Sequence, residues 1–304
     1  MSSSRPEPRH VLVLVLAAAC WGTGTALSKQ AVTELPPLTL LAVQLLVSLT
    51  LLGVIAHLRR EPLLRGRAAS RIGRLGLLNP GLAYALSLLG LAQITASLSV
   101  LLWALEPVLI VALAVLLLGE RPGWFLVGLA GLAILGVGLV AYDPAATGAI
   151  PGIVLTMAGV ACCAVYTVAT RRWLPEAPST IAVVVVQQAY ALAFAAVLLV
   201  LVGALGQPLV PSRVTPLGLS SAVASGLVYY GLAYALYLTG LRVVLASTAA
   251  MSFYLIPVFG VAAAGVFGDR LASLQWIGAL VVVTAVAGIT VQSQNQGATA
   301  SADR

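Results

Sequence analysis

Residues 81–86 read Gly-Leu-Ala-Tyr-Ala-Leu, and residues 231–236 read Gly-Leu-Ala-Tyr-Ala-Leu again, 150 positions later. The same offset aligns further identical pairs: Gly90 with Gly240, Pro107 with Pro257, Val111 with Val261, Gly128 with Gly278 and Gly138 with Gly288. One hexamer can recur by chance in a chain rich in Leu and Ala, but a train of matches held in register indicates an internal duplication. We therefore predict that each half of the chain forms one copy of a repeated structural unit.

The composition indicates a membrane protein. Hydrophobic residues make up 61% of the chain and charged residues only 8%, whereas a soluble domain carries roughly 25% charged residues. The net charge of +7 fits membrane topology and gives no reason to expect a nucleic-acid partner. The cysteines all fall in apolar runs and no His/Cys cluster occurs, so we expect no disulfide framework, metal site or cofactor; these cysteines are Cys20, Cys162 and Cys163.

Ten apolar segments are long enough to cross a bilayer as helices. They lie near residues 9–28, 36–57, 75–93, 95–118, 123–142, 149–170, 180–203, 217–239, 243–267 and 274–292. Two copies of an odd number of spans must face opposite ways, which is a frequent transporter design. We therefore predict an all-α polytopic membrane protein of ten transmembrane helices arranged as two inverted five-helix repeats, with the repeats at 1–145 and 146–292 and a disordered cytoplasmic tail at 293–304.

Positive charge predicts the orientation. Six arginines lie between the second and third spans, and alternation from that loop leaves only three of the 16 basic residues on the outer side: Lys29, Arg213 and Arg270. By the positive-inside rule both termini are cytoplasmic, in a multi-pass protein of the inner (plasma) membrane. Residues 17–20 resemble the end of a lipoprotein signal peptide, but the apolar run continues past Cys20 and favours an uncleaved first helix.

Three motifs carry a family resemblance: Trp21-Gly22-Thr23 with Ser28-Lys29; the stretch from Leu105-Glu106-Pro107-Val108 to Leu118-Gly119-Glu120-Arg121; and an echo at Ser247, Pro257 and Gly268-Asp269-Arg270. In order and spacing the chain resembles the ten-helix EamA branch of the drug/metabolite transporter superfamily. The resemblance implies that spans 1–4 and 6–9 surround a central cavity, with spans 5 and 10 at the periphery. Gln44 stands where that family often has arginine, and Cys163 where it often has tryptophan.

Glu106 is the only carboxylate in the interior of the predicted spans. A charge near the bilayer centre costs at least ~2.5 kcal/mol, so such groups usually face a cavity and mark a pathway. Pro107 follows it and predicts a helix kink. The repeat counterpart is Ile256. Glu106 is either a proton-coupling group or a neutral acid that joins helices, and in the first case we expect it to face the central cavity near spans 1, 3 or 9.

Other polar or aromatic residues inside the spans are candidates to line a substrate site: Trp21, Thr23, Gln44, Tyr84, Trp103, Tyr166, Gln187, Tyr234 and Tyr254, with Thr25 and Tyr190 as further candidates. For any single aromatic the alternative is an interface belt or a lipid contact. Tyr84 and Tyr234 are repeat-related, so they are expected to approach the midplane from opposite sides. Lys29 is either an interfacial anchor or a functional lysine.

Glycines repeat along one face of the fifth span and again of the tenth, where small residues allow close helix contact either within the protomer or in a homodimer; they are Gly128, Gly131 and Gly138, then Gly278 and Gly288. Both a monomer and a homodimer remain open.

Together these features predict a secondary active transporter, an exporter of small metabolites such as amino-acid-like solutes or of drugs. It would work by alternating access around a central cavity, with protons as a candidate coupling ion. The partners are then a small-molecule substrate and the lipid bilayer. We do not expect an enzyme, because no nucleophile–base or metal motif occurs in the sequence. The alternatives are an intramembrane enzyme and a channel-like or lipid-handling scaffold.

Overall fold

A computed structural model describes residues 8–62, 64–118, 124–141, 149–170, 179–211, 213–241 and 255–302, and the regular structure in these residues is helical. The first half of the chain forms α1 (Pro8–Val32), α2 (Pro37–Leu58), α3 (Gly66–Gly76), η1 (Leu77–Leu82), α4 (Ala83–Leu91), α5 (Ala96–Trp103), α6 (Glu106–Leu118) and α7 (Trp124–Ala141). The second half forms α8 (Ala149–Thr170), α9 (Thr180–Ala204), α10 (Pro216–Ser225), η3 (Gly226–Leu232), α11 (Ala233–Leu241), α13 (Leu255–Val266) and α14 (Ser273–Ala302).

The helices are those of a polytopic membrane protein. Six of the described helical segments are long and apolar enough to cross a bilayer, and four shorter apolar helices accompany them. Large apolar side chains cover the outside of the bundle, among them Leu46, Val54, Val200, Leu201 and Leu280. Such a surface is stable only against lipid, because extended apolar patches in water promote association.

Several helices begin where the sequence provides a cap. Thr95 accepts a hydrogen bond from the backbone N–H of Leu98 at 3.2 Å, and Thr215 accepts one from Gly218 at 3.1 Å. These side chains satisfy donors that the first turns of α5 and α10 leave without a partner. Pro37 and Pro216 occupy first-turn positions, where the missing N–H costs nothing.

The third span differs from its predicted bounds. Helix α3 begins at Gly66, inside the segment predicted as a cytoplasmic loop up to residue 74, because residues 67–76 contain no proline and can continue the helix outward. Its arginines therefore lie on helical turns. Similarly, α1 extends to Val32, and α14 continues to Ala302 through most of the segment predicted as a disordered tail.

Two irregular segments occupy equivalent positions in the repeats, a kink in η1 of the third span and a π-helical turn, η3, in the eighth. The sequence did not predict them. In η1, Asn79 leaves helical geometry before Pro80, whereas the aligned positions of η3 are Tyr229 and Tyr230. Such bulges rotate the following side chains and are frequent at functional sites.

The fourth span is interrupted at Ala104 and Leu105, between α5 and α6 and next to the kink predicted at Pro107. Proline lacks the backbone N–H that would continue the helix through this point. The interruption places Glu106 at the first position of α6.

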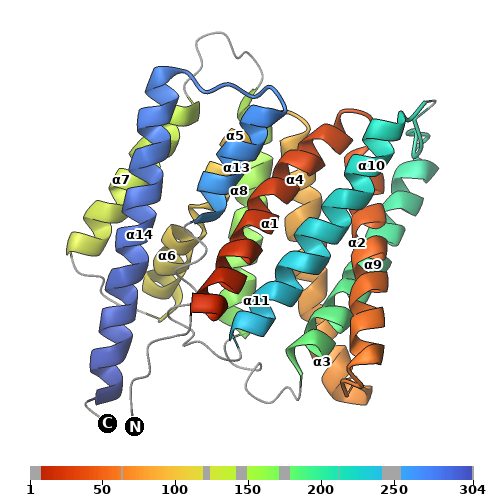
Figure 1. Ribbon diagram of the computed structural model, residues 1–304, viewed down its shortest axis with the longest axis horizontal. Coiled ribbons are helices and arrows are strands. Elements are labelled where there is room, and N and C mark those ends of the chain that lie inside the picture. The colour runs from red at the N-terminus through yellow and green to blue at the C-terminus, as the bar shows by residue number, and fades with distance from the viewer. Residues whose placement is uncertain are drawn as a thin grey trace.

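Most helix contacts recur when the two halves are exchanged, although α1 packs extensively against α10 and α8 does not pack in the same way against α3. Helix α1 packs against α13, α10, η3 and α11, while its repeat counterpart α8 packs against α6, η1 and α4. Helix α2 packs against α9, and α7 against α14 at one side of the bundle (Figure 1). The central helices and this peripheral pair match the arrangement that the resemblance implied.

Helices α1 and α8 run in opposite directions. Lys29, near the end of α1, donates a hydrogen bond to the carbonyl oxygen of Leu91 at 2.8 Å. A side chain at Gly90, the neighbour of Leu91, would meet Gly152 and Thr156 near the start of α8. Helix α8 therefore begins at the end of the bundle where α1 finishes (Figure 1).

The glycine-rich faces of α7 and α14 have different surroundings. Gly278 approaches Gly136 of α7, and Gly288 lies against Leu129. By contrast, no atom of another helix lies within 4 Å of the position that a Cβ would take on Gly128, Gly131 or Gly138. Packing within the protomer thus explains the glycine-rich face of α14 only, and the glycine-rich face of α7 is directed away from the other helices.

Candidate functional site

Aromatic side chains from both repeats meet in the centre of the bundle, and we call them the aromatic cluster: Trp21, Tyr84, Trp103, Tyr229, Tyr230, Tyr234 and Tyr237. The ring centroid of Tyr84 lies 5.5 Å from that of Trp103 and 5.7 Å from that of Tyr229. Trp21 packs edge-on against Tyr234 at 5.4 Å. These are ordinary edge and tilted contacts between rings.

Tyr84 and Tyr234, the repeat-related pair, meet hydroxyl to hydroxyl at 3.2 Å. Tyr84 lies in α4 and Tyr234 in α11, at the same position of each repeat. Residues related by the duplication can touch each other only close to the axis that relates the halves. This hydrogen bond therefore marks the centre of the molecule.

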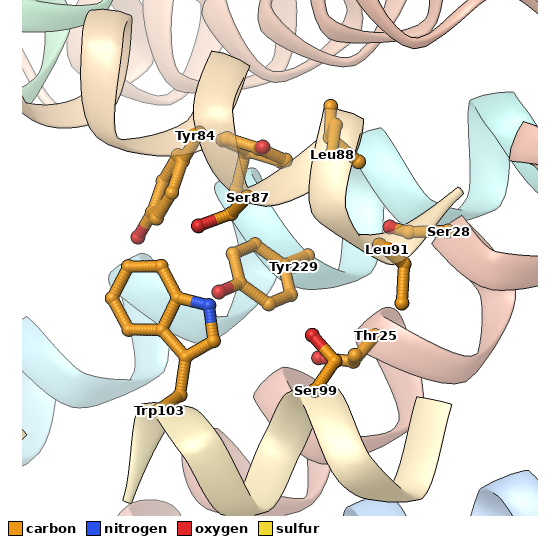
Figure 2. Close-up of a pocket in the computed structure, with 10 residues that line it drawn as sticks. Thr25, Ser28, Tyr84, Ser87, Leu88, Leu91, Ser99, Trp103 and Tyr229 are labelled. Atoms are coloured by element: carbon orange, nitrogen blue, oxygen red, sulfur yellow. The ribbon is translucent and has the colours of Figure 1, made fainter. Parts of the chain in front are cut away.

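A small cavity lies beside the aromatic cluster. Its volume is about 30 Å³, which is enough for about one water molecule. Its wall is formed by hydroxyl-bearing, aliphatic and aromatic side chains, namely Thr25, Ser28, Tyr84, Ser87, Leu88, Leu91, Ser99, Trp103, Tyr229 and Tyr230. Figure 2 shows Tyr84, Trp103 and Tyr229 converging from different helices, with Ser99 and Thr25 nearby.

Glu106 contacts α8. Its carboxyl Oε1 accepts a hydrogen bond from the Thr167 hydroxyl at 3.0 Å, and the Cys163 thiol hydrogen-bonds to the same carboxyl. We expected the Glu106 carboxyl to lie near spans 1, 3 or 9, but both of these partners belong to α8, the sixth span. The reason is that α6 packs directly against α8. Glu106 also does not form part of the wall of the 30 Å³ cavity.

Cys163 connects Glu106 with the aromatic cluster. The Asn79 amide of η1 donates to the Cys163 sulfur at 3.4 Å, and Cys163 packs in the same buried cluster as Tyr84 and Tyr230. Glu106 therefore lies at the edge of the aromatic cluster, on its α8 side.

Two glutamines proposed for the site are buried. The amide nitrogen of Gln44 donates to Ser28 at 2.9 Å and to Ser225 at 2.7 Å, which joins α2 to α1 and α10. Gln187 accepts a hydrogen bond from the Tyr166 hydroxyl at 2.9 Å. Within the described residues, the Gln44 carbonyl oxygen and the Gln187 amide nitrogen are buried with no hydrogen-bond partner. Each retains capacity for one more polar contact.

The remaining candidates differ in their positions. Thr23 is half-buried and does not line the cavity, whereas Thr25 and Ser28 on the same helix do. Lys29 is engaged with the Leu91 carbonyl at the end of the bundle. Tyr254 lies outside the described residues, as do Ser247 and the Gly119-Glu120-Arg121 motif.

Comparison with known families decides the relationship. The model of the EamA-like transporter family matches residues 9–142 and again residues 150–291. The chain belongs to the EamA-like transporter family. The two matched segments coincide with the two halves of the internal duplication, and the resemblance to the drug/metabolite transporter superfamily is confirmed.

A solved structure described as "Crystal structure of protein" resembles this EamA-like transporter with a TM-score of 0.64 and 22% sequence identity, over 95% of this chain and 98% of the other. At this identity the likeness shows a shared fold. No curated protein matches the sequence.

Several site residues of the EamA-like transporter could not be found from the sequence. Tyr229 and Tyr230 have Asn79 and Pro80 as repeat counterparts, so the duplication did not mark them. Thr167 has no distinguishing signal inside an apolar helix. A hydroxyl or aromatic group every three or four residues, as at Tyr84 and Ser87 or at Thr25 and Ser28, is the pattern that indicates the cavity wall.

The cavity wall offers binding groups of two kinds, ring faces and hydroxyls, and the Glu106 carboxyl lies outside this wall beside Thr167 and Cys163. Among the described residues no group of three or more His, Cys, Asp or Glu side chains is placed to hold a metal ion. Rings and hydroxyls can contact a small organic molecule, and the carboxyl can carry a proton or pair with a cation.

Proposed function

We propose that the protein is a secondary active transporter that exports small metabolites or drugs by alternating access around the aromatic cluster. The observation that carries this proposal is the hydroxyl contact between Tyr84 and Tyr234. Substrate sites of inverted-repeat transporters lie at the interface of the repeats, and this pair lies at that interface.

The same proposal includes ten transmembrane helices in two inverted five-helix repeats. It is supported by the opposite directions of α1 and α8 and by the helix contacts that recur when the halves are exchanged, such as α1 with α13 and α8 with α6. Helices α5 and α6 together form one span, and α7, at about 27 Å, nearly matches a hydrocarbon core of about 30 Å. The position in the plasma membrane, with cytoplasmic termini, belongs to this proposal as well.

Alternating access needs two conformations with the site open to one side at a time. In the described conformation the cavity is too small for an organic solute. The packed rings of the aromatic cluster close the centre, which favours a carrier over a channel, because a channel requires a continuous polar path. The break between α5 and α6, the kink in η1 and the π-helical turn η3 are the points at which the central helices can bend.

Glu106 is the proposed coupling residue. A carboxyl that gains and loses a proton during the cycle would link the substrate movement to a proton gradient. Its contacts with Thr167 and Cys163 suit both states, since a hydroxyl and a thiol can donate to a carboxylate and the hydroxyl can accept from a carboxylic acid.

The test is flux into proteoliposomes. Radiolabelled amines, amino acids and organic cations are offered at saturating concentration with and without a pH gradient. We expect wild-type flux to increase with the gradient, and we expect Glu106→Gln to remain folded with a flux that no longer responds to it. Glu61→Gln, which removes a carboxylate outside the spans, is the matched control. A gradient response that survives in Glu106→Gln would contradict proton coupling, and no flux of any solute would contradict transport.

A further inference from the structure

Three arginines share one face of α3, at the lower end of the bundle in Figure 1. Arg67, Arg71 and Arg74 are spaced four and three residues apart, so their side chains lie on the same side of the helix. The opposite side is buried at Ile72, Gly73 and Gly76, where α3 packs against the rest of the bundle, chiefly α9. Packing of the buried side therefore fixes the arginines on the outer side.

An open hollow lies along this outer side of α3. Its volume is about 560 Å³, and its wall is formed by Arg67, Ala68, Ser70, Arg71 and Arg74. Sites for small organic ligands have volumes of about 300–1,000 Å³. Arg74 donates a hydrogen bond from Nη2 to the Ser70 hydroxyl oxygen at 3.3 Å, which uses one of the five N–H donors of a guanidinium group. The hollow thus offers guanidinium groups and a hydroxyl, which suit a phosphate.

The sequence around the hollow is basic. Glu61 is the one acid among residues 59–105, which contain six arginines, and α9 contains no Asp or Glu. Residues 171–178, before α9, lie outside the described residues, and their sequence contains two arginines and one glutamate. An excess of positive charge attracts anions and repels cations.

The position of the hollow along the third span favours a lipid over a soluble anion. Exposed leucines follow the arginines on the same span, at Leu77 and Leu82. Leu77 is three residues beyond Arg74, which is about 4.5 Å along a helix, and the headgroup layer on each side of a bilayer is about 5–7 Å thick. A phospholipid whose phosphate lies at the arginines can therefore place an acyl chain on the leucines.

We propose that the hollow on α3 binds the headgroup of an anionic phospholipid, with Arg67, Arg71 and Arg74 holding the phosphate and an acyl chain against Leu77 and Leu82. By the positive-inside rule this end of the bundle faces the cytoplasm, where the leaflet carries anionic lipids. Orientation of the chain in the membrane requires only the charge of all six arginines, whereas the headgroup site requires the three that line the hollow. The proposal goes beyond transport and does not depend on it.

Native mass spectrometry of the purified full-length protein in detergent measures lipid binding. Dioleoylphosphatidylglycerol should bind roughly tenfold or more tightly than dioleoylphosphatidylcholine, which has the same acyl chains and no net charge. Equal affinities would overturn the inference. Inorganic phosphate and glycerol phosphate carry the anionic group without acyl chains, so displacement of the lipid by either at micromolar concentration would assign a site for soluble anions and would also overturn it.

Two variants with the same loss of charge separate a site from a general charge effect. The test variant combines Arg67→Gln, Arg71→Gln and Arg74→Gln, and the control variant replaces the three arginines of residues 59–65 with Gln. Phosphatidylglycerol binding should weaken roughly tenfold or more in the test variant and less than threefold in the control. Equal weakening in the two monodisperse proteins, or none in the test variant, would overturn the inference.

Cross-linking to the wild-type protein needs no variant. Phosphatidylglycerol and phosphatidylcholine probes, each with a diazirine near the glycerol end of one acyl chain, are mixed into vesicles that contain the protein. The ratio of phosphatidylglycerol to phosphatidylcholine labelling should be highest at residues 75–82 and near one at Leu280, an exposed side chain of α14. The same ratio at both places would overturn the lipid site and leave the proposed transport function in place.

Discussion

At the scale of single residues, the contact between Tyr84 and Tyr234 gives a quantitative prediction. Either Tyr→Phe change leaves the other buried hydroxyl without this partner, which costs about 1–3 kcal/mol, whereas replacing both removes both polar groups. The double variant should therefore be more stable than either single variant and closer to the wild type. Thermal unfolding in detergent of the four proteins measures this, and simple additivity of the two losses would show that the hydroxyls do not interact.

The residue scale also shows how far the sequence could predict the site. Tyr84 and Tyr234 could be paired because the 150-residue offset links them directly. Glu106 stands out because it is a charge in an apolar span, but its partners Thr167 and Cys163 could not be predicted. Helices that are apolar all round have no amphipathic pattern to show which face turns inward.

At the scale of helices, close packing of α1 on α13 depends on Gly22. A Cβ at this position would lie within 3 Å of backbone atoms of Ile256, Phe259 and Gly260. Backbone cannot move aside as a side chain can, so Gly22→Ala should destabilise the protein by about 1–3 kcal/mol. Unfolding temperature is the measurement.

Gly53 provides the matched control for this change. It lies inside α2 with no atom within 4 Å of the Cβ position, so Gly53→Ala should gain up to about 1 kcal/mol from helix propensity. Equal effects at Gly22 and Gly53 would contradict the close approach of α1 and α13.

The N-terminus of α10 gives a prediction of pH dependence. Glu34 accepts hydrogen bonds from the hydroxyl and the backbone N–H of Thr215, both at 2.7 Å, and these bonds lower the pKa of its carboxyl. A carboxyl with a lowered pKa stabilises the folded state fully above its ordinary pKa, and this contribution is lost as pH falls through the folded-state value.

The difference in unfolding temperature between wild type and Glu34→Gln should therefore be constant near neutral pH and shrink below about pH 4.3, the ordinary glutamate pKa. A difference that stays constant down to pH 3 would show that the Thr215 contact does not favour the charged form.

The positions of the helices could be predicted from the sequence, but their irregular turns and their exact ends could not. Span positions followed from runs of apolar residues, since hydrocarbon forces the backbone into helices. The π-helical turn η3 was missed, because a register change of one residue leaves no compositional signal, whereas the kink in η1 does have a signal in Asn79-Pro80. Helix α3 starts early because arginine-containing turns can extend beyond the apolar core as helix.

At the scale of the whole molecule, the orientation can be tested with single reporter cysteines in a background without Cys20, Cys162 and Cys163. Position 65 lies before α3, and position 207 lies near the opposite end, where Thr39 bonds to Leu209. In intact cells Arg65→Cys should be shielded from a membrane-impermeant reagent, and Gln207→Cys should react. The reverse pattern would overturn the proposed topology.

The central claim is that this molecule carries a solute across the membrane by alternating access, and counterflow tests it most directly. Proteoliposomes loaded with a millimolar solute from a panel of amines, amino acids and organic cations are diluted into a trace of the same labelled solute, with no pH gradient. The proposed carrier predicts transient accumulation of label above equilibrium for at least one solute. Label that only equilibrates would indicate a channel, and label that stays outside for every solute would contradict transport.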